Sequence, residues 1–170
     1  MKQVNSVGLV LLMAVASAPL AAQGNQPKSL VVTAVNMTAD SAREAGLERK
    51  DKTMARPGDV IGYSLAFTNT TRGTVRSVQF VDPLPKGLVY LPGSARADKP
   101  VQIEYSIDGG KTYLARPMIV VVESGQRVEK PAPRDAYTHI RWTVSGPLAP
   151  GAQVTAGFEA EVSKSASEAK

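Results

Sequence analysis

The segment IGYSLAFT, at residues 61–68, decides the fold class of this chain. In an extended strand, one face would carry its large apolar side chains, Ile61, Tyr63, Leu65 and Phe67. Small and polar side chains occupy the other face. The segment is bounded by turn residues, RPGD at 56–59 and NTTRG at 69–73. This pattern predicts an antiparallel strand that is buried on one side only.

The same period of two recurs along most of the chain, between short groups of Gly, Pro, Asn and Asp. Further strands are expected at residues 30–36, 78–80, 88–91, 101–107, 139–144 and 154–162. The sequence therefore predicts an all-β fold, an immunoglobulin-like sandwich of two antiparallel sheets with about seven to nine strands. A closed barrel is the alternative that the pattern leaves open.

Three segments are harder to assign from the pattern. The apolar run Met118–Val122 predicts a strand buried on both faces, and residues 125–135 predict a proline-bearing loop. The sequence DGG at 108–110 predicts a tight hairpin with a return strand from Thr112. Residues 38–52 are charged and contain three spaced apolar residues, so a loop and a single helical turn both fit them.

The two ends of the chain differ from the rest. Residues 1–22 combine an early Lys2, an apolar run and a small-residue exit, which is the pattern of a signal peptide cleaved after Ala22. We expect one domain at residues 23–164, a polar disordered tail at 165–170, and no membrane-spanning segment after cleavage. These features predict an exported protein, located in the periplasm, outside the cell or on its surface.

Composition removes several classes of function. The 170 residues contain no cysteine, which excludes disulfides, zinc thiolate sites and cysteine nucleophiles. The net charge of +5 is spread along the chain, which is typical of a solubilising surface. Nucleic acid is not an expected partner, since basic clusters interleaved with aromatic residues are missing.

Four turn motifs follow one another in a fixed order. They are PGDVIGY at 57–63, TNT at 68–70, DPLPKGL at 82–88 and LAPGA at 148–152. In this order they resemble the conserved-repeat domain of unknown function numbered eleven, a family of immunoglobulin-like modules in prokaryotic exported and surface proteins. The resemblance spans residues 30–162 and implies a structural or adhesive envelope module without catalytic residues. The chain departs from the family in having one copy and an added segment at 114–137, which argues against a spacer role.

Candidate chemistry is sparse. The lone His139 alternates with core positions and is expected on an outer face near Arg141. No catalytic, cofactor-binding or metal-binding residues are predicted. The loop aspartates have no calcium-loop spacing: Asp108 fits the expected hairpin, and Asp82 a cap of the turn before its prolines. A cryptic hydrolase would need paired carboxylates, for which the candidates are Glu104, Glu123, Glu159 and Glu161. Alternation places three of them, Glu104, Glu159 and Glu161, on solvent faces.

The function that fits best is binding of a protein or envelope polymer through loops or sheet edges. Aromatic and arginine side chains dominate binding hot spots, which selects Tyr113, Arg116, Arg127, Arg134 and Tyr137. A subunit that lends or accepts a strand is the main alternative, because Met118–Val122 and Leu30–Val35 are both apolar. A carbohydrate-binding module is the third. The oligomeric state is not determined by the sequence.

Overall fold

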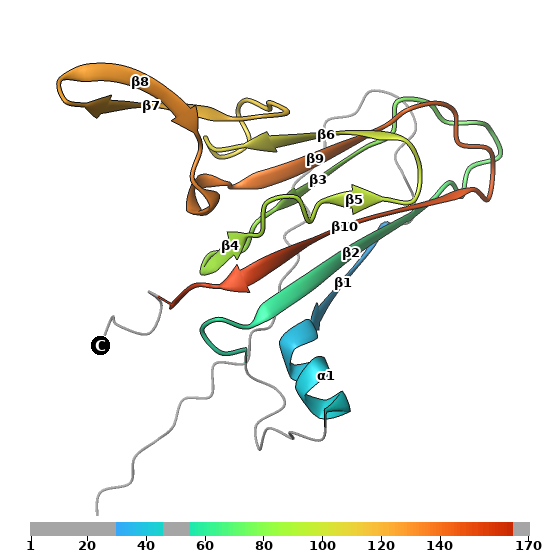
Figure 1. Cartoon of the computed structure of the whole chain (residues 1–170). Coiled ribbons are helices and arrows are strands. Elements are labelled where there is room, and N and C mark those ends of the chain that lie inside the picture. The colour runs from blue at the N-terminus through green and yellow to red at the C-terminus, as the bar shows by residue number, and fades with distance from the viewer. Residues whose placement is uncertain (1–29, 46–54, 165–170) are drawn as a thin grey trace, which may run out of the picture.

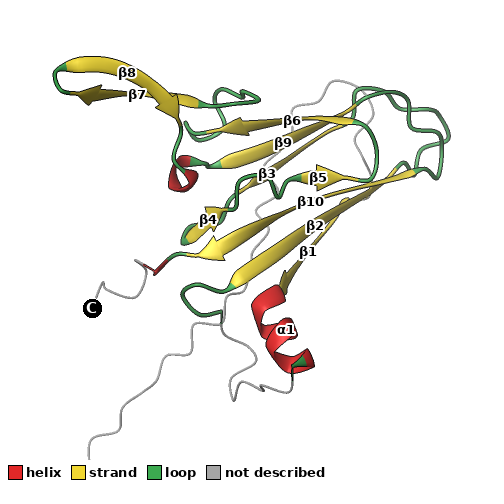
Figure 2. Cartoon of the chain, in the orientation of Figure 1, coloured by secondary structure: helices red, strands yellow, loops and turns green. Residues whose placement is uncertain are grey.

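The computed structural model describes residues 30–45 and 55–164. The signal peptide predicted at 1–22 and the tail predicted at 165–170 lie outside these residues. Within them the chain forms ten strands, one α-helix and one short 3-10 helix (Figures 1 and 2).

One sheet is built around the two longest strands. It contains β1 (Leu30–Asn36), β2 (Val60–Thr68), β10 (Gln153–Val162), β4 (Leu88–Tyr90) and the two-residue β5 (Arg96–Ala97). The strands lie in the order β1-β2-β10-β4, with β5 pairing with β10, and every pairing is antiparallel. Strand β1 is therefore one edge of this sheet.

The second sheet has three antiparallel strands. It contains β3 (Gln79–Pro83), β9 (His139–Val144) and β6 (Val101–Ser106), in the order β3-β9-β6. No strand of one sheet pairs with a strand of the other within the described part of the chain. The predicted two-sheet sandwich is thus confirmed, and the barrel alternative is wrong.

The core lies between the two sheets and follows the predicted alternation. Tyr63 and Phe67 of β2 are buried on the inner face, and Trp142 of β9 is fully buried opposite them. The ring of Tyr63 stacks on Phe158 of β10, with 4.8 Å between ring centroids. Each such side chain contributes roughly 1.5–3 kcal/mol through burial, so packing stabilises the fold without disulfides.

The largest difference from the sequence prediction lies at residues 118–131. They form a separate hairpin of β7 (Met118–Glu123) and β8 (Gln126–Pro131), not a buried strand followed by a loop. Ser124 and Gly125 connect the two strands with positive φ angles of 51° and 82°, which suits a two-residue hairpin turn. The predictions for both segments were wrong because an apolar run does not reveal what covers it. The hairpin and the short β5 bring the number of strands in the described residues to ten, which exceeds the predicted seven to nine.

The segment left open at residues 38–52 begins with helix α1 (Met37–Glu44), and residues 46–54 lie outside the described part. Asn36 caps the helix by accepting the backbone N–H of Ala39 at 2.9 Å. Met37 covers Gly62, where an added Cβ would lie 2.8 Å from the Met37 sulfur. The helix therefore packs on the outer face of β2.

Two local predictions were also wrong. The return strand expected from Thr112 is reduced to one β-bridge between Tyr105 and Leu114. Asp108 holds this loop by accepting the backbone N–H groups of Lys111 and Thr112, each at 3.0 Å. Asp82 is not a turn cap, because it lies within β3 on the same face as the buried Phe80.

Candidate binding surface at the hairpin end

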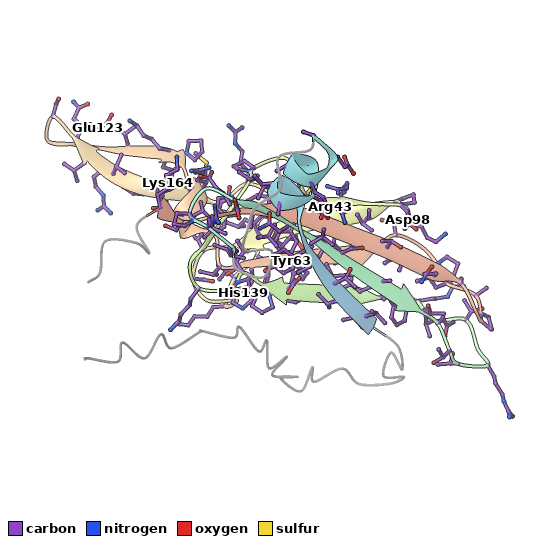
Figure 3. The ribbon with its side chains drawn as sticks, turned by 90° about the horizontal axis from the view of Figure 1, so that it is seen from below. Arg43, Tyr63, Asp98, Glu123, His139 and Lys164 are labelled. Atoms are coloured by element: carbon purple, nitrogen blue, oxygen red, sulfur yellow. The ribbon has the colours of Figure 1, made fainter. Side chains whose placement is uncertain are left out.

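The hairpin projects from the end of the sandwich where β6 ends and β9 begins (Figure 1). Its base is closed by a hydrogen bond from the backbone N–H of Ala132 to the carbonyl of Pro117, at 2.9 Å. Neither strand of the hairpin pairs with either sheet of the sandwich. In Figure 3, Glu123 at the outer end of the hairpin lies away from His139 and Tyr63. The hairpin is thus an element displayed by the sandwich and not part of its core.

One face of the hairpin is apolar and open to solvent. Met118, Val120 and Val122, here called the hairpin strip, point to the same side of β7. Val120 is 51% exposed and Val122 is 71% exposed. Arg127 of β8 pairs with Val122 and is exposed on the same face. Methionine and arginine, represented here by Met118 and Arg127, are enriched in protein interfaces.

Arg127 and Arg116 carry unpaired charges. No ion pair to either arginine occurs in the described part of the chain, and both are exposed. Burial raises the pKa of Tyr137, and the positive charge of the nearby Arg116 partly opposes this effect. These two predicted residues are therefore available to a partner.

Tyr137 is partly buried in an aromatic cluster. Its ring lies 5.2 Å from that of Tyr90 and 5.3 Å from that of Tyr105, and the Tyr90 hydroxyl donates to that of Tyr105 at 3.2 Å. Burial raises the pKa of Tyr105. Tyr137 thus anchors the 3-10 helix Arg134–Ala136 to the sandwich, and only its remaining exposed part can meet a partner.

Arg134 and Tyr113 make internal contacts. Arg134 donates to the carboxylate of Glu161 at 2.9 Å, which ties the short helix to the end of β10. The guanidinium of Arg141 lies 4.1 Å from the centre of the Tyr113 ring, in cation–π geometry. The structure therefore brings the five predicted residues to one end of the molecule but not into one cluster.

His139 and its neighbours form a structural contact. His139 is half-buried, with Nδ1 3.1 Å from the hydroxyl of Thr138. Burial lowers the pKa of His139, and the charge of Asp108 opposes this effect. Gly110 packs against its ring, since an added Cβ would lie 3.4 Å from the imidazole.

The candidate hydrolase carboxylates are each engaged by a cation. Glu104 accepts two hydrogen bonds from Arg141, at 2.7 and 3.1 Å. The other ion pairs are Glu123 with Lys130, Glu159 with Arg96, and Glu161 with Arg134. A retaining or inverting glycosidase instead needs two carboxylates that face one substrate. These pairings therefore give no support to the hydrolase alternative.

A shallow concavity of about 340 Å³ lies beside β5. Arg96 on its wall is paired with Glu159 at 3.3 Å, and Asp98 accepts the backbone N–H of Thr155 at 2.8 Å. Its charged groups are thus used within the fold. In residues 30–45 and 55–164, no three His, Cys, Asp or Glu side chains are grouped so that they could hold a metal ion.

Two features escaped the sequence analysis. The first is the carboxyl group of Asp82, whose Oδ2 is buried and has no hydrogen-bond partner among the described residues. Burial raises the pKa of Asp82 from 3.8 to about 6, and burial with the charge of Asp82 raises that of Tyr63 to about 12. The alternation Val78, Phe80, Asp82 carried this signal, because it places Asp82 on the inner face.

The second feature is the exposure of β1. Its apolar residues are open on both faces of the strand, although the sequence suggested an ordinary half-buried strand. The signal was present in LVVTAVN, which is apolar at both odd and even positions. Such a strand is expected in the middle of a covered sheet, and here it is at an edge.

Comparisons with known proteins add little about function. No protein-family model matches the chain, and no curated protein matches it. Among solved structures, a pilus backbone protein of Streptococcus pneumoniae is similar, with a TM-score of 0.38 and 11% identity. The match covers 81% of this chain and 47% of that protein, so the chain spans about half of the pilus protein's length. A likeness at this level carries no argument about function. Within the described residues, no helix is long and apolar enough to cross a membrane.

Proposed function

We propose that this chain is an exported, non-enzymatic protein of the cell envelope that binds a protein partner through its projecting hairpin. The observation that carries the proposal is the hairpin strip, which is exposed on an element held outside the core. Exposed apolar patches that adjoin polar groups mark interaction sites in proteins. Arg127 on the same face and Arg116 near the hairpin base supply unpaired charges for such a contact.

A protein suits this surface better than a hydrated polysaccharide. The strip consists of aliphatic side chains, and burial of apolar area is what would drive association. The two charged side chains beside the concavity at β5, Arg96 and Asp98, already make contacts within the fold, which leaves them less free to recognise sugar hydroxyls.

Export is supported by the amino-acid sequence alone. Residues 1–22 have the basic start, apolar run and small-residue exit of a signal peptide. The envelope role is supported by the motif order that resembles the conserved-repeat domain family. A non-enzymatic role is supported by the ion pairs that engage the four glutamates and by the structural contacts of His139.

The experiment compares two forms of the full chain as bait against envelope proteins of the producing cell. One is the natural chain, and the other has Met118–Pro131 replaced by two glycines. The ends of the deleted segment adjoin, because Pro117 and Ala132 share a backbone hydrogen bond. A matched control carries Gln102→Ala, at an exposed position on β6.

We expect one protein to be retained by the natural chain and the Gln102→Ala control but not by the hairpin-deleted form. That protein, once purified, should bind the natural chain at least tenfold more tightly than the deleted form in a pairwise titration. Equal binding by the deleted form, with its sandwich still folded, would refute the hairpin as the binding element.

A further inference from the structure

Strand β1 is an unprotected sheet edge. It pairs with β2 on one side, and no described strand pairs with its other side. Its four largest apolar side chains are each between 42% and 55% exposed: Leu30, Val31, Val32 and Val35. The seven residues include no charged residue and no proline. Native sheet edges normally carry such residues, because a bare edge recruits another strand.

The inner face of β1 is open because the second sheet ends too early. Leu30 and Val32 pair with Phe67 and Leu65 of β2, so all four point toward the core side. Phe67 and Leu65 are almost fully buried, yet Leu30 and Val32, one strand further out, are not. The sheet with the order β1-β2-β10-β4 therefore extends at β1 beyond the sheet with the order β3-β9-β6, which leaves the inner face of β1 uncovered.

Strand β7 is also an apolar edge strand. Its first five residues are all apolar, so both faces are apolar, and only β8 pairs with it. The edge on the far side of the hairpin differs. Strand β8 carries Arg127, Glu129 and Lys130 and ends at Pro131. The hairpin therefore has one blunted edge and one bare edge.

The other edges are protected or short. Strand β3 includes Asp82 and ends at Pro83. The outer side of β6 is occupied by Leu114, which exchanges two backbone hydrogen bonds with Tyr105, at 2.8 and 3.0 Å. Strands β4 and β5 have three and two residues. Among the described strands, β1 and the first five residues of β7 are thus the two long apolar edges, and the one charged residue of β7, Glu123 at its end, is paired with Lys130 of β8.

From this match we infer that copies of the chain join head to tail, with β7 of one copy lying alongside β1 of the next. The two strands have six and seven residues, and β1 carries no charge that could repel β7. Pairing would cover apolar residues on both faces of both strands and place the charged β8 at the new edge. The inference deepens the proposed function by naming a second copy as the hairpin's partner.

The contact would be heterologous, since it joins two different surfaces. Copies joined in this way form an open chain or a closed ring, and a dimer held by one self-complementary contact is not expected. Pairing of β1 with β1, or of β7 with β7, would leave the other bare edge of each copy uncovered. The head-to-tail arrangement leaves a bare edge only at the two ends of an open assembly.

Two lysine variants of the full chain test this arrangement. Val31→Lys with Val35→Lys blocks β1, and Val120→Lys with Val122→Lys blocks β7; all four positions are exposed. Gln79→Lys with Gln102→Lys is the matched control, at exposed positions of the second sheet. Sedimentation velocity is measured over a wide concentration range. Fluorescence of the buried Trp142 shows whether each variant is folded. If a double variant does not fold, the single variant Val31→Lys or Val120→Lys is used in its place.

The natural chain and the control should form larger species as concentration rises, and each blocked variant should stay monomeric. An equimolar mixture of the two blocked variants should form a one-to-one dimer and nothing larger, because only one productive contact remains. Persistent dimers of either blocked variant alone would overturn the inference in favour of a symmetric contact. A natural chain that stays monomeric at every concentration would also overturn the inference. In that case the proposed function would still be supported if the hairpin-deleted form failed to retain the partner that the natural chain retains.

Discussion

Replacement of Asp82 by asparagine is expected to stabilise the folded chain at neutral pH. The carboxylate lies on the inner face of β3, and its Oδ2 is buried without a hydrogen-bond partner in the described part of the chain. A buried charge without a partner is costly, and the folded protein reduces this cost by holding a proton on the group. This is why burial raises the pKa of Asp82 from 3.8 to about 6.

Because the pKa of Asp82 is higher in the folded chain than in the unfolded chain, the free energy of unfolding falls as pH rises. Well below pH 3.8 the group is protonated in both the folded and the unfolded chain, so its ionisation makes no contribution to stability there. As pH rises from about 4 to about 6, the unfolded chain loses this proton first, and the free energy of unfolding falls. A difference of about two pH units corresponds to about 3 kcal/mol, which partial solvent exposure of the side chain reduces to about 1–2 kcal/mol.

The assay is urea denaturation of the natural chain and Asp82→Asn at pH 4 and pH 7.5, followed by Trp142 fluorescence. The variant should be more stable by about 1–2 kcal/mol at pH 7.5, and the difference should vanish or reverse at pH 4. Asp135→Asn, at an exposed position, is the control and should change stability by less than about 0.5 kcal/mol. A variant that is less stable at pH 7.5, or a difference independent of pH, would refute the burial of an unpartnered carboxylate.

Three further predictions concern the core, the sheet and export. Trp142→Ala should cost about 3–5 kcal/mol in urea denaturation, because the ring is fully buried, and a cost below about 1 kcal/mol would contradict that placement. Gly157→Ala should cost about 1–3 kcal/mol, since its Cβ would lie 2.6 Å from the backbone oxygen of Tyr63, while Gly73→Ala, with no atom within 4 Å of its Cβ, should be nearly neutral. The mature protein from the cell envelope should begin at Gln23 in N-terminal sequencing, and a protein that retains Met1 would contradict export through a cleaved signal peptide.

The sandwich could be predicted because its core obeys a local rule. Alternation at residues 61–67 and 154–162 fixes which side chains face inward, and both strands follow it in the structure. Turn residues such as Pro57 and Gly58 mark where the strands begin. These signals depend on neighbouring residues alone, so they are visible without knowledge of the partner strand.

The hairpin could not be predicted in the same way. An apolar run such as Met118–Val122 is compatible with a buried strand, and nothing within the run shows whether a second sheet covers it. Ser124 and Gly125 did carry a turn signal, but their positive φ angles become evident only in the structure. The exposure of β1 has the same origin, because it depends on where the opposite sheet ends.

The contacts of the candidate site residues could not be predicted from the sequence. Residue type selected arginines and tyrosines at residues 113–137, and the structure places all five at the hairpin end. Whether an arginine is free depends on which glutamate its strand register brings near, as with Arg134 and Glu161. Such pairing between distant segments is not encoded in local sequence patterns.

Copies of the chain can join through β1 and β7 only if these strands are bare edges in the monomer. Amide hydrogen exchange on the dilute chain tests this most directly. Alternate amides of Leu30–Asn36 and Met118–Glu123 should exchange rapidly, while those of β2, β9 and β10 stay protected, and protection should appear at both edges together as concentration rises. Uniform protection of β1 and β7 in the dilute monomer would show that these edges are already covered and would contradict the account.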